Sequence, residues 1–464
     1  MSCIKFGTDG WRAVLGRDFN YDNVNKVINA VSLYIYNTSA YDKKIITGYD
    51  PRNKADEYAF YTAEKFSDFG FDVQISREIT ATPVLAYSAL KEDAYAVMFT
   101  ASHNPPEYLG IKFIPPYGGP ADDDTVNKIA ANLEKTFIPA GVSKKYKTVS
   151  FENEYIKHIN NIIDFERIKK SGIKINYDGH HGAAGKLFLR ILDEHGIKYN
   201  SLNIERDINF GGFMPDPKEE YLPALKKLCI TTGLPGFSND GDGDRYGVFD
   251  ENGIFISPND ITAMLLKHLV INRHFSGKLA KTIGASDMLK FYAEKLGIEV
   301  IETAVGFKHL GAAMRSDDVI IAGEESGGLS FKGHIPEKDG IAAVLLIMEM
   351  TAYSGRKLFE IHSDFLKELN RQFVNRRIDI KLTSQQQADE IMKKAEQLKD
   401  IKGLKIVKTN KIDGLKLYLE DKSSILIRKS GTEPLLRIYF ETSSAETAGR
   451  LEKAAREILL PAGI

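Results

Sequence analysis

The stretch Ile45–Asp50, IITGYD, joins an apolar run to a glycine and an acidic residue, and it decides the fold because the chain repeats its pattern. Ile173–Gly179 (IKINYDG) and Ala280–Asp287 (AKTIGASD) have the same sequence of features. The repetition predicts three strand–helix units, and therefore three similar α/β domains in tandem. Apolar side chains at helical spacing follow each run, after the first at Ala59, Thr62, Ala63 and Phe66.

Each unit leads to a second strand that ends on an unusual loop. These loops are Thr100–Pro105, Asn239–Arg245 and Gly323–Gly328. Alternation of strands and helices favours largely parallel sheets, whose ligand sites lie beyond the carboxyl ends of the strands. We therefore expect the chemistry of this protein in the three loops.

The pattern changes after about Glu368. A lysine- and glutamine-rich helix over Gln385–Lys399, strands at Leu415–Leu419 and Ile425–Arg428, and a helix from Ala445 predict a smaller α+β domain. The predicted fold class is α/β, with three tandem similar α/β domains that have mixed sheets and a smaller C-terminal α+β domain. We place the domains at residues 1–147, 148–251, 252–368 and 369–464.

Bulk composition narrows the function. The 464 residues are 43% hydrophobic and 27% charged, as in folded soluble proteins. Lys+Arg number 62 against 63 Asp+Glu, which argues against nucleic-acid binding and against attachment to a membrane by charge. Two cysteines, no signal peptide and no apolar stretch of bilayer length favour a reducing, cytoplasmic location. We expect small-molecule partners only, and a monomer or homodimer.

Thr100–Pro105, TASHNP, follows the apolar run Tyr95–Phe99 and places a serine, a histidine and an amide on one turn. Pro105 and Pro106 end the strand, because proline fixes φ and donates no N–H. We expect Ser102 to be exposed there, at the reaction centre. The alternative is a turn that only satisfies its own backbone.

Asp240, Asp242 and Asp244 alternate with glycines, so that the backbone can curl and turn three carboxylates toward one point. A hard divalent cation suits them, because close carboxylates otherwise repel one another. An EF-hand loop is the competing interpretation, but its sixth position requires glycine and this chain has Arg245. Mg²⁺ keeps coordination positions open for phosphate oxygens, which indicates phosphoryl chemistry.

Two further loops carry polar side chains. Arg428–Pro434 (RKSGTEP), with Arg437 on the next strand, has the residue types of a phosphate-binding loop, or of a basic hairpin tip. Gly323–Gly328 (GEESGG) offers acceptors and a hydroxyl that suit sugar hydroxyls, although taken alone the segment favours a surface turn.

Taken together and in this order, the four loops resemble the α-D-phosphohexomutase family, which includes phosphoglucomutases and phosphomannomutases. The resemblance spans nearly the whole chain, from Phe6–Arg12 (FGTDGWR) to Arg437–Tyr439. It implies four domains around a central cleft, the last a mobile phosphate-binding lid. It also implies interconversion of hexose 1-phosphate and hexose 6-phosphate, of glucose or mannose, through a phosphoserine and a hexose 1,6-bisphosphate.

The resemblance also implies roles for individual residues. Ser102 would carry the phosphoryl group and ligate Mg²⁺ together with Asp240, Asp242 and Asp244. Lys112 matches the position of the family's catalytic lysine, beside His103 and Arg12, although without the resemblance we would expect an exposed strand lysine. Glucose 1,6-bisphosphate would serve as activator and intermediate. The implied substrate-binding residues are Arg245, Thr303, Gly306, Lys308, Glu324, Ser326, Arg428, Ser430, Gly431, Thr432 and Arg437.

Some features depart from the family pattern. Many bacterial phosphomannomutase-like members have histidine where this chain has Gly328, so that a histidine role in this loop and the choice of substrate stay open. Trp11 and the Pro105-Pro106 doublet make a glucosamine phosphate substrate the less favoured expectation. A glucose 1,6-bisphosphate synthase and a non-catalytic sugar-phosphate sensor on the same fold are the alternative functions.

Overall fold

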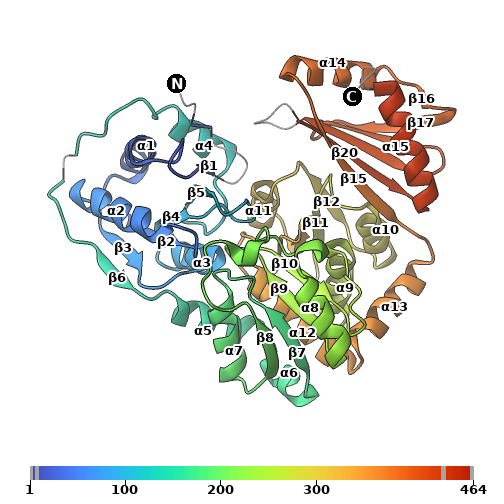
Figure 1. Cartoon of the computed structure of the whole chain (residues 1–464), viewed down its shortest axis with the longest axis horizontal. Coiled ribbons are helices and arrows are strands. Elements are labelled where there is room, and N and C mark those ends of the chain that lie inside the picture. The colour runs from blue at the N-terminus through green and yellow to red at the C-terminus, as the bar shows by residue number, and fades with distance from the viewer. Residues whose placement is uncertain (1–3, 6–9, 140, 430–434, 460–464) are drawn as a thin grey trace.

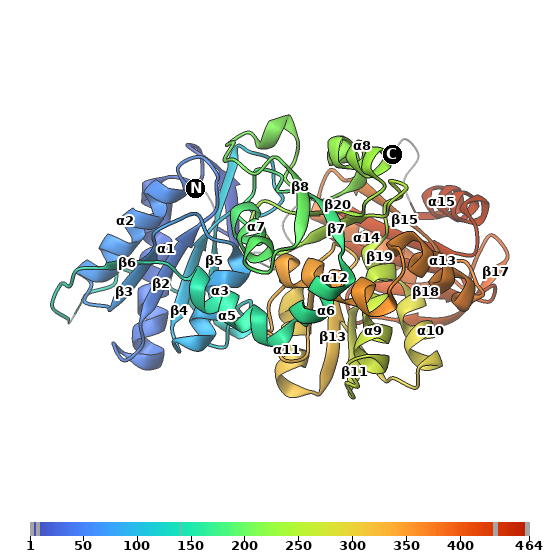
Figure 2. The same cartoon turned by 90° about the horizontal axis from the view of Figure 1, so that it is seen from below.

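The computed structural model describes residues 4–5, 10–139, 141–429 and 435–459 of the chain. It forms four units, which follow one another from blue to red (Figure 1, Figure 2). The first unit begins with a six-stranded sheet and its helices. Its elements are β1 (Trp11–Val14), α1 (Tyr21–Ser39), β2 (Ile45–Tyr49), α2 (Ala55–Asp68), β3 (Val73–Ser76), α3 (Thr82–Lys91), β4 (Tyr95–Phe99), β5 (Tyr108–Ile114), α4 (Asp123–Ala130) and β6 (Lys147–Val149).

The second unit has a four-stranded sheet. Its elements are α5 (Glu152–Ile162), α6 (Phe165–Ser171), β7 (Lys174–Asp178), α7 (Gly185–Glu194), β8 (Lys198–Leu202), the 3₁₀ turns Phe210–Gly212 and Glu219–Tyr221, α8 (Pro223–Thr232), β9 (Gly236–Asn239) and β10 (Tyr246–Phe249). β10 occupies the position where an EF-hand would need a helix, so the competing EF-hand interpretation is wrong.

The third unit has another four-stranded sheet. Its helix α9 begins where the Ser257 side chain accepts a hydrogen bond from the Asp260 amide and Pro258 fills the first turn. The elements are α9 (Pro258–Ile271), β11 (Lys278–Thr282), α10 (Asp287–Lys295), β12 (Val300–Thr303), α11 (Phe307–Ser316), β13 (Val319–Gly323), β14 (Leu329–Phe331), α12 (Gly340–Ser354) and α13 (Leu358–Leu369).

The fourth unit is smaller and antiparallel throughout, with strand order β15-β20-β19-β18-β17-β16. The strands and helices predicted after Glu368 are confirmed here. The elements are β15 (Val374–Lys381), α14 (Gln385–Glu396), β16 (Asp400–Ile401), β17 (Leu404–Asn410), β18 (Leu415–Leu419), β19 (Ser424–Lys429), β20 (Leu435–Thr442) and α15 (Ala445–Leu459).

The first three sheets share one topology. Their strand orders contain β5-β4-β2-β3, β10-β9-β7-β8 and β14-β13-β11-β12, in which the first strand is antiparallel and the others are parallel. The predicted fold of three similar α/β domains with mixed sheets and a smaller fourth domain is therefore confirmed. The three chemical loops are the equivalent connections β4–β5, β9–β10 and β13–β14, so the repeated topology gives them the same position in each unit.

Candidate active site

Ser102 lies at the tip of the β4–β5 loop in a left-handed backbone conformation, with φ of 52°. Its amide donates to the Thr100 hydroxyl at 2.7 Å, and that hydroxyl donates to Asp50 at 2.5 Å. Such a conformation is costly for a residue with a side chain and persists only where its surroundings hold it. The fully buried Arg52 guanidinium does so by donating to the carbonyls of Ser102 (2.7 Å), Asn104 (2.6 Å), Pro105 (2.8 Å) and Tyr108 (3.1 Å).

The expectation that Ser102 is exposed is wrong, because only 1% of the residue is accessible. Its hydroxyl donates to Asp240 Oδ2 at 3.0 Å, across the junction between the first and second units. A Cβ on Gly241 would lie 2.7 Å from the Ser102 carbonyl oxygen, so a glycine is needed for the two loops to approach this closely. The β9–β10 loop therefore covers the serine.

The three aspartates of the β9–β10 loop form one buried cluster. Each of Asp240, Asp242 and Asp244 offers a carboxylate oxygen within 4.8 Å of the others. Burial, followed by the charges of Asp244 and Asp242, raises the pKa of Asp240 well above its usual range. Asp240 Oδ1 also accepts the amides of Asp244 (2.9 Å) and Arg245 (3.0 Å), which curls the loop as the glycine spacing predicted.

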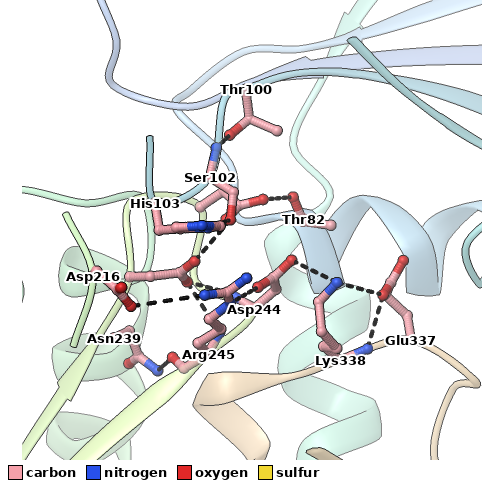
Figure 3. Close-up of polar contacts among 12 residues, drawn as sticks. Thr82, Thr100, Ser102, His103, Asp216, Asn239, Asp244, Arg245, Glu337 and Lys338 are labelled. Atoms are coloured by element: carbon pink, nitrogen blue, oxygen red, sulfur yellow. Dashed lines mark hydrogen bonds and ion pairs between the residues drawn. The ribbon is translucent and has the colours of Figure 1, made fainter. Parts of the chain in front are cut away.

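Two lysines from other units reach the same carboxylates. Lys112, on β5, donates to Asp242 Oδ2 at 2.8 Å and to Asp244 Oδ2 at 2.7 Å, and it is buried rather than an exposed strand lysine. Lys338, between β14 and α12, lies 3.3 Å from Asp244 Oδ2 (Figure 3). Three units thus supply charged groups to one point.

The cluster fits a divalent cation. Hard oxygen ligands dominate it, and Asp244 Oδ1 is buried with no hydrogen-bond donor among the described residues, although Arg245 Nε lies 3.9 Å from it. A buried anionic oxygen without a donor is costly, and a bound cation removes that cost. Asp240, Asp242 and Asp244, with the oxygen on Ser102 beside them, are the residues that would hold the cation.

His103 and Arg12 complete the serine loop. His103 Nδ1 lies 3.4 Å from the Ser102 hydroxyl. Burial, followed by the charges of Arg245, Arg12 and other cations, lowers the pKa of His103 well below its usual range, so its imidazole is neutral at pH 7. Arg12, on β1, donates to the Asn104 side chain at 2.8 Å and so braces the far side of the loop.

Arg245 ends the aspartate loop and joins it to the third unit. Its backbone forms an antiparallel bridge with Gly328, and the Tyr246 amide donates to the Gly327 carbonyl at 3.2 Å. Its guanidinium lies 3.7 Å from Asp216, which also pairs with Lys218 at 2.7 Å. The β9–β10 and β13–β14 loops are therefore adjacent.

Glu324 begins the β13–β14 loop and is buried. Its Oε1 accepts the Gly306 amide at 3.1 Å, and burial raises its pKa to about 7, against the opposing charge of Lys338. The Thr303 hydroxyl donates to the neighbouring Ala304 carbonyl at 3.0 Å, and Ser326 lies in the turn after Glu324. The structure thus brings together Glu324 and Gly306, two of the predicted substrate residues.

Lys308 lies elsewhere. It extends from the first turn of α11 to Asp123 of α4, 2.6 Å away in the first unit. In this arrangement Lys308 links the third unit to the first, and its ion pair is not with the other predicted substrate residues.

The two arginines of the fourth unit that were predicted to bind phosphate lie on neighbouring strands. Arg428 on β19 and Arg437 on β20 are cross-strand partners. Arg428 Nε donates to Asp413 at 2.8 Å, and Arg437 Nε lies 3.9 Å from Asp379. Ser430, Gly431 and Thr432, the other predicted residues of this loop, lie outside the described residues.

Several contributors to the site were not predicted. Arg52 and Asp50 follow β2 directly, so their place at a strand end was an available signal. Thr82 donates to Asp242 at 2.6 Å from the start of α3, and nothing in its sequence surroundings indicates that contact. Lys338 comes from a loop of the third unit and reaches Asp244, and Asp216 comes from an earlier loop of the second unit and lies near Arg245, so that only the folded chain brings them to the site.

Family models match the whole length of this arrangement. Three are phosphoglucomutase/phosphomannomutase alpha/beta/alpha domains, namely domain I at residues 3–138, domain II at residues 153–253 and domain III at residues 257–369. The fourth is the C-terminal domain of the same family, at residues 378–458.

Individual proteins are similar over nearly their full length. A phosphoglucomutase/phosphomannomutase of Thermococcus kodakarensis is 30% identical, over 96% of this chain and 95% of that protein. A probable phosphoglucosamine mutase of Methanosphaera stadtmanae is 29% identical, over 98% of both. The crystal structure of a putative phosphomannomutase from Thermus thermophilus superposes with a TM-score of 0.87 at 26% identity, covering 99% of this chain and all of the other. Within the described ranges, no helix is long and apolar enough to cross a membrane.

Proposed function

The chain belongs to the phosphoglucomutase/phosphomannomutase family, and on that premise we propose that it moves a phosphoryl group between the 1 and 6 positions of a hexose through a phosphorylated Ser102. The resemblance inferred from the four loops is confirmed at the level of the family. The observation that carries the proposal is the contact of 3.0 Å between the buried Ser102 hydroxyl and Asp240, within the cluster of three aspartates.

The buried serine suits phosphoryl transfer. Its strained loop is held by Arg52, so the hydroxyl oxygen is fixed before substrate binds. Phosphoryl transfer needs positioning and charge stabilisation more than covalent chemistry. Mg²⁺ at Asp240, Asp242 and Asp244 would supply positive charge for the transferring group.

Protons must move as the phosphoryl group moves. When the group leaves Ser102, the serine oxygen needs a proton, and when a sugar hydroxyl attacks, that hydroxyl must lose one. His103 Nδ1 lies 3.4 Å from the serine oxygen. Lys112 reaches the aspartate cluster from β5, the strand that follows the serine loop. We assign proton transfer to Lys112, with His103 and Arg12 supporting the serine loop.

Substrate would lie between the serine and the fourth unit. Glu324 and Ser326 are the proposed readers of sugar hydroxyls, and Arg245 borders them. Arg428 and Arg437 would hold the phosphate that does not react, because guanidinium groups match phosphate geometry. Exchange of the two phosphates requires the hexose 1,6-bisphosphate to bind in both orientations, which this arrangement of one reactive and one holding site permits.

Glucose and mannose phosphates are the proposed substrates. The 29% identity to a probable phosphoglucosamine mutase supports glucosamine phosphate as a second candidate, so the sequence argument against it has no support from the relatives. A test must therefore include all three sugars.

The test is phosphorus NMR with Mg²⁺, catalytic glucose 1,6-bisphosphate and each of glucose, mannose and glucosamine 1-phosphate. We expect 6-phosphate to accumulate with the wild type and to be lost, by more than about 10⁴-fold, in Ser102→Ala. Ser88→Ala, at a buried serine on α3, is the control and should leave turnover unchanged. Turnover that survives Ser102→Ala would contradict the mechanism, and bisphosphate accumulation without isomerisation would favour the synthase.

A further inference from the structure

The loop between β12 and α11 offers two consecutive amides to two carboxylates. The Val305 amide donates to Asp413 Oδ2 at 3.0 Å, and the Gly306 amide donates to Glu324 Oε1 at 3.1 Å. Glu324 belongs to the third unit, whereas Asp413 lies in the β17–β18 turn of the fourth. Gly306 has φ of 120°, a conformation that favours glycine and lets both amides reach their partners.

Asp413 also holds the proposed phosphate-binding arginine. Arg428 Nε lies 2.8 Å and Nη2 lies 2.7 Å from Asp413 Oδ2, the same oxygen that accepts the Val305 amide. The Arg428 side chain is 11% accessible and the Asp413 side chain 26%, so these charge-assisted hydrogen bonds are partly shielded from water. One carboxylate oxygen thus collects donors from two units.

The turn that carries Asp413 is fixed on both sides. A Cβ at Gly414 would lie 2.3 Å from the Ile427 carbonyl oxygen, so the turn packs directly on β19. Asn410, at the other end of the turn, donates to Glu302 of β12 at 2.8 Å. The turn therefore links β19 with the strand that precedes Val305.

We propose that Asp413 is a positioning residue that couples Arg428 of the fourth unit to Glu324 of the third through the amides of Val305 and Gly306. The coupling is physical, because one Cα separates two planar peptide groups and a shift of one amide moves the other. When phosphate engages Arg428, the shared carboxylate transmits the displacement to the loop and to Glu324. The substrate part of this inference rests on the proposed function.

Asp379 provides a matched control. It accepts from Arg377 at 2.8 and 2.7 Å and lies 3.9 Å from Arg437. Like Asp413 it orients arginines on the same sheet, but these partners belong to its own unit. Asp379→Asn and Asp413→Asn therefore remove the same charge, and only the second weakens the acceptor of the Val305 amide.

The first experiment needs no ligand. Hydrogen exchange at single residues is measured by mass spectrometry for Asp413→Asn, Asp379→Asn and Glu324→Gln. We expect Asp413→Asn to speed exchange about tenfold at the Val305 amide, its own partner, and also at the Gly306 amide. We expect Glu324→Gln to speed exchange at the Gly306 amide, its own partner, and also at the Val305 amide. Asp379→Asn should change neither amide. If each variant affects only its own amide, the coupling is absent and the inference is wrong.

The second experiment measures affinity for glucose, mannose and glucosamine 6-phosphates by calorimetry in the Ser102→Ala background, where turnover does not intervene. We expect Asp413→Asn to weaken binding about tenfold, and its effect to shrink at least threefold once Glu324→Gln is present. The effects of Asp379→Asn and Glu324→Gln on affinity should be independent, so that the double variant shows the product of the two fold-changes. If the Asp413→Asn and Glu324→Gln pair also shows the product of its two fold-changes, the coupling is wrong. Coupled amides in a protein that binds none of the sugars would instead overturn the proposed function.

Discussion

The first three units and the fourth unit are joined to the molecule in different ways. One apolar core runs from Ile46 through Phe188 to Leu369 and so passes through the first three units. The fourth unit has a separate core, formed by residues 380–459. Burial of apolar surface is non-directional and large, so the first three units hold one arrangement. The serine and the aspartates lie in that continuous part.

Buried charges join the fourth unit instead. Lys416 of β18 lies 2.8 Å from Asp287, and Glu441 of β20 accepts the Asp287 amide at 3.1 Å. The fully buried Lys281 pairs with Glu302 at 2.9 Å beside them. Desolvation offsets much of the attraction in such pairs, so a polar junction gives a defined contact with little net stability. From this difference we expect the reactive centre to be fixed, and the fourth unit to be able to part from it without unfolding.

Arg52→Met breaks the continuous part and should have the largest effect. It removes four hydrogen bonds to the serine loop and leaves the Asp50 carboxylate buried without the Arg52 guanidinium. Burial raises the pKa of Asp50 to about 6, and the charge of Arg52 opposes that rise. We expect a loss of about 3–5 kcal/mol from the unfolding free energy, with loss of turnover. The unfolding free energy is measured by urea denaturation, with Arg190→Met as the control. Arg190 forms an exposed surface ion pair with Glu194, and such a pair contributes about 0–1 kcal/mol. Equal losses in the two variants would contradict this account.

Lys416→Met breaks the junction instead. It leaves the Asp287 carboxylate without the nearer of its two lysines. We expect this to weaken the association of the fourth unit with the third by about 3 kcal/mol. We expect the fourth unit to separate while the main unfolding transition of the other three stays in place. Small-angle scattering and proteolysis near residue 372 measure this, with the exposed Lys408→Met as control. A single transition that moves as a whole would show that the four units form one cooperative body.

Asp244→Asn tests whether the cation belongs to the fixed part. It removes one buried carboxylate, and we expect Mg²⁺ to bind more than about 100-fold more weakly by calorimetry. Asp250→Asn removes the same charge from a buried position at the end of β10 and should leave Mg²⁺ affinity unchanged. Similar affinities in the two variants would exclude the aspartate cluster as the cation site.

Glu324 should give the smallest effect, through pH. Since burial raises its pKa to about 7, the folded protein holds this carboxyl protonated below pH 7 and ionised above it. The ionised form accepts more hydrogen bonds from sugar hydroxyls, so KM should fall about fivefold between pH 6 and pH 8. Glu324→Gln should flatten this profile, and the adjacent Glu325→Gln should keep it. A slope that Glu324→Gln leaves unchanged would assign the titration to another group.

Sequence reasoning predicted what depends on local pattern. The strand runs near Ile45, Ile173 and Ala280 indicated repeated units, because apolar strands followed by helical periodicity form locally recognisable elements. The alternation of Asp240, Asp242 and Asp244 with glycine indicated a converging loop, since that geometry lies within six residues. The division at 1–147, 148–251, 252–368 and 369–464, and the site roles carried from the family, stay predictions.

Tertiary structure alone decided the rest. The burial of Ser102, the fourfold donation by Arg52 and the arrival of Lys112 and Lys338 at one cluster join residues that lie far apart in the chain. The sequence by itself determined which elements form and which loops carry chemistry, because propensity, spacing and turn residues act over short range. Only packing decided which side chains meet, and whether apolar surface or paired charge joins one unit to the next, because those contacts depend on the fold of the entire chain.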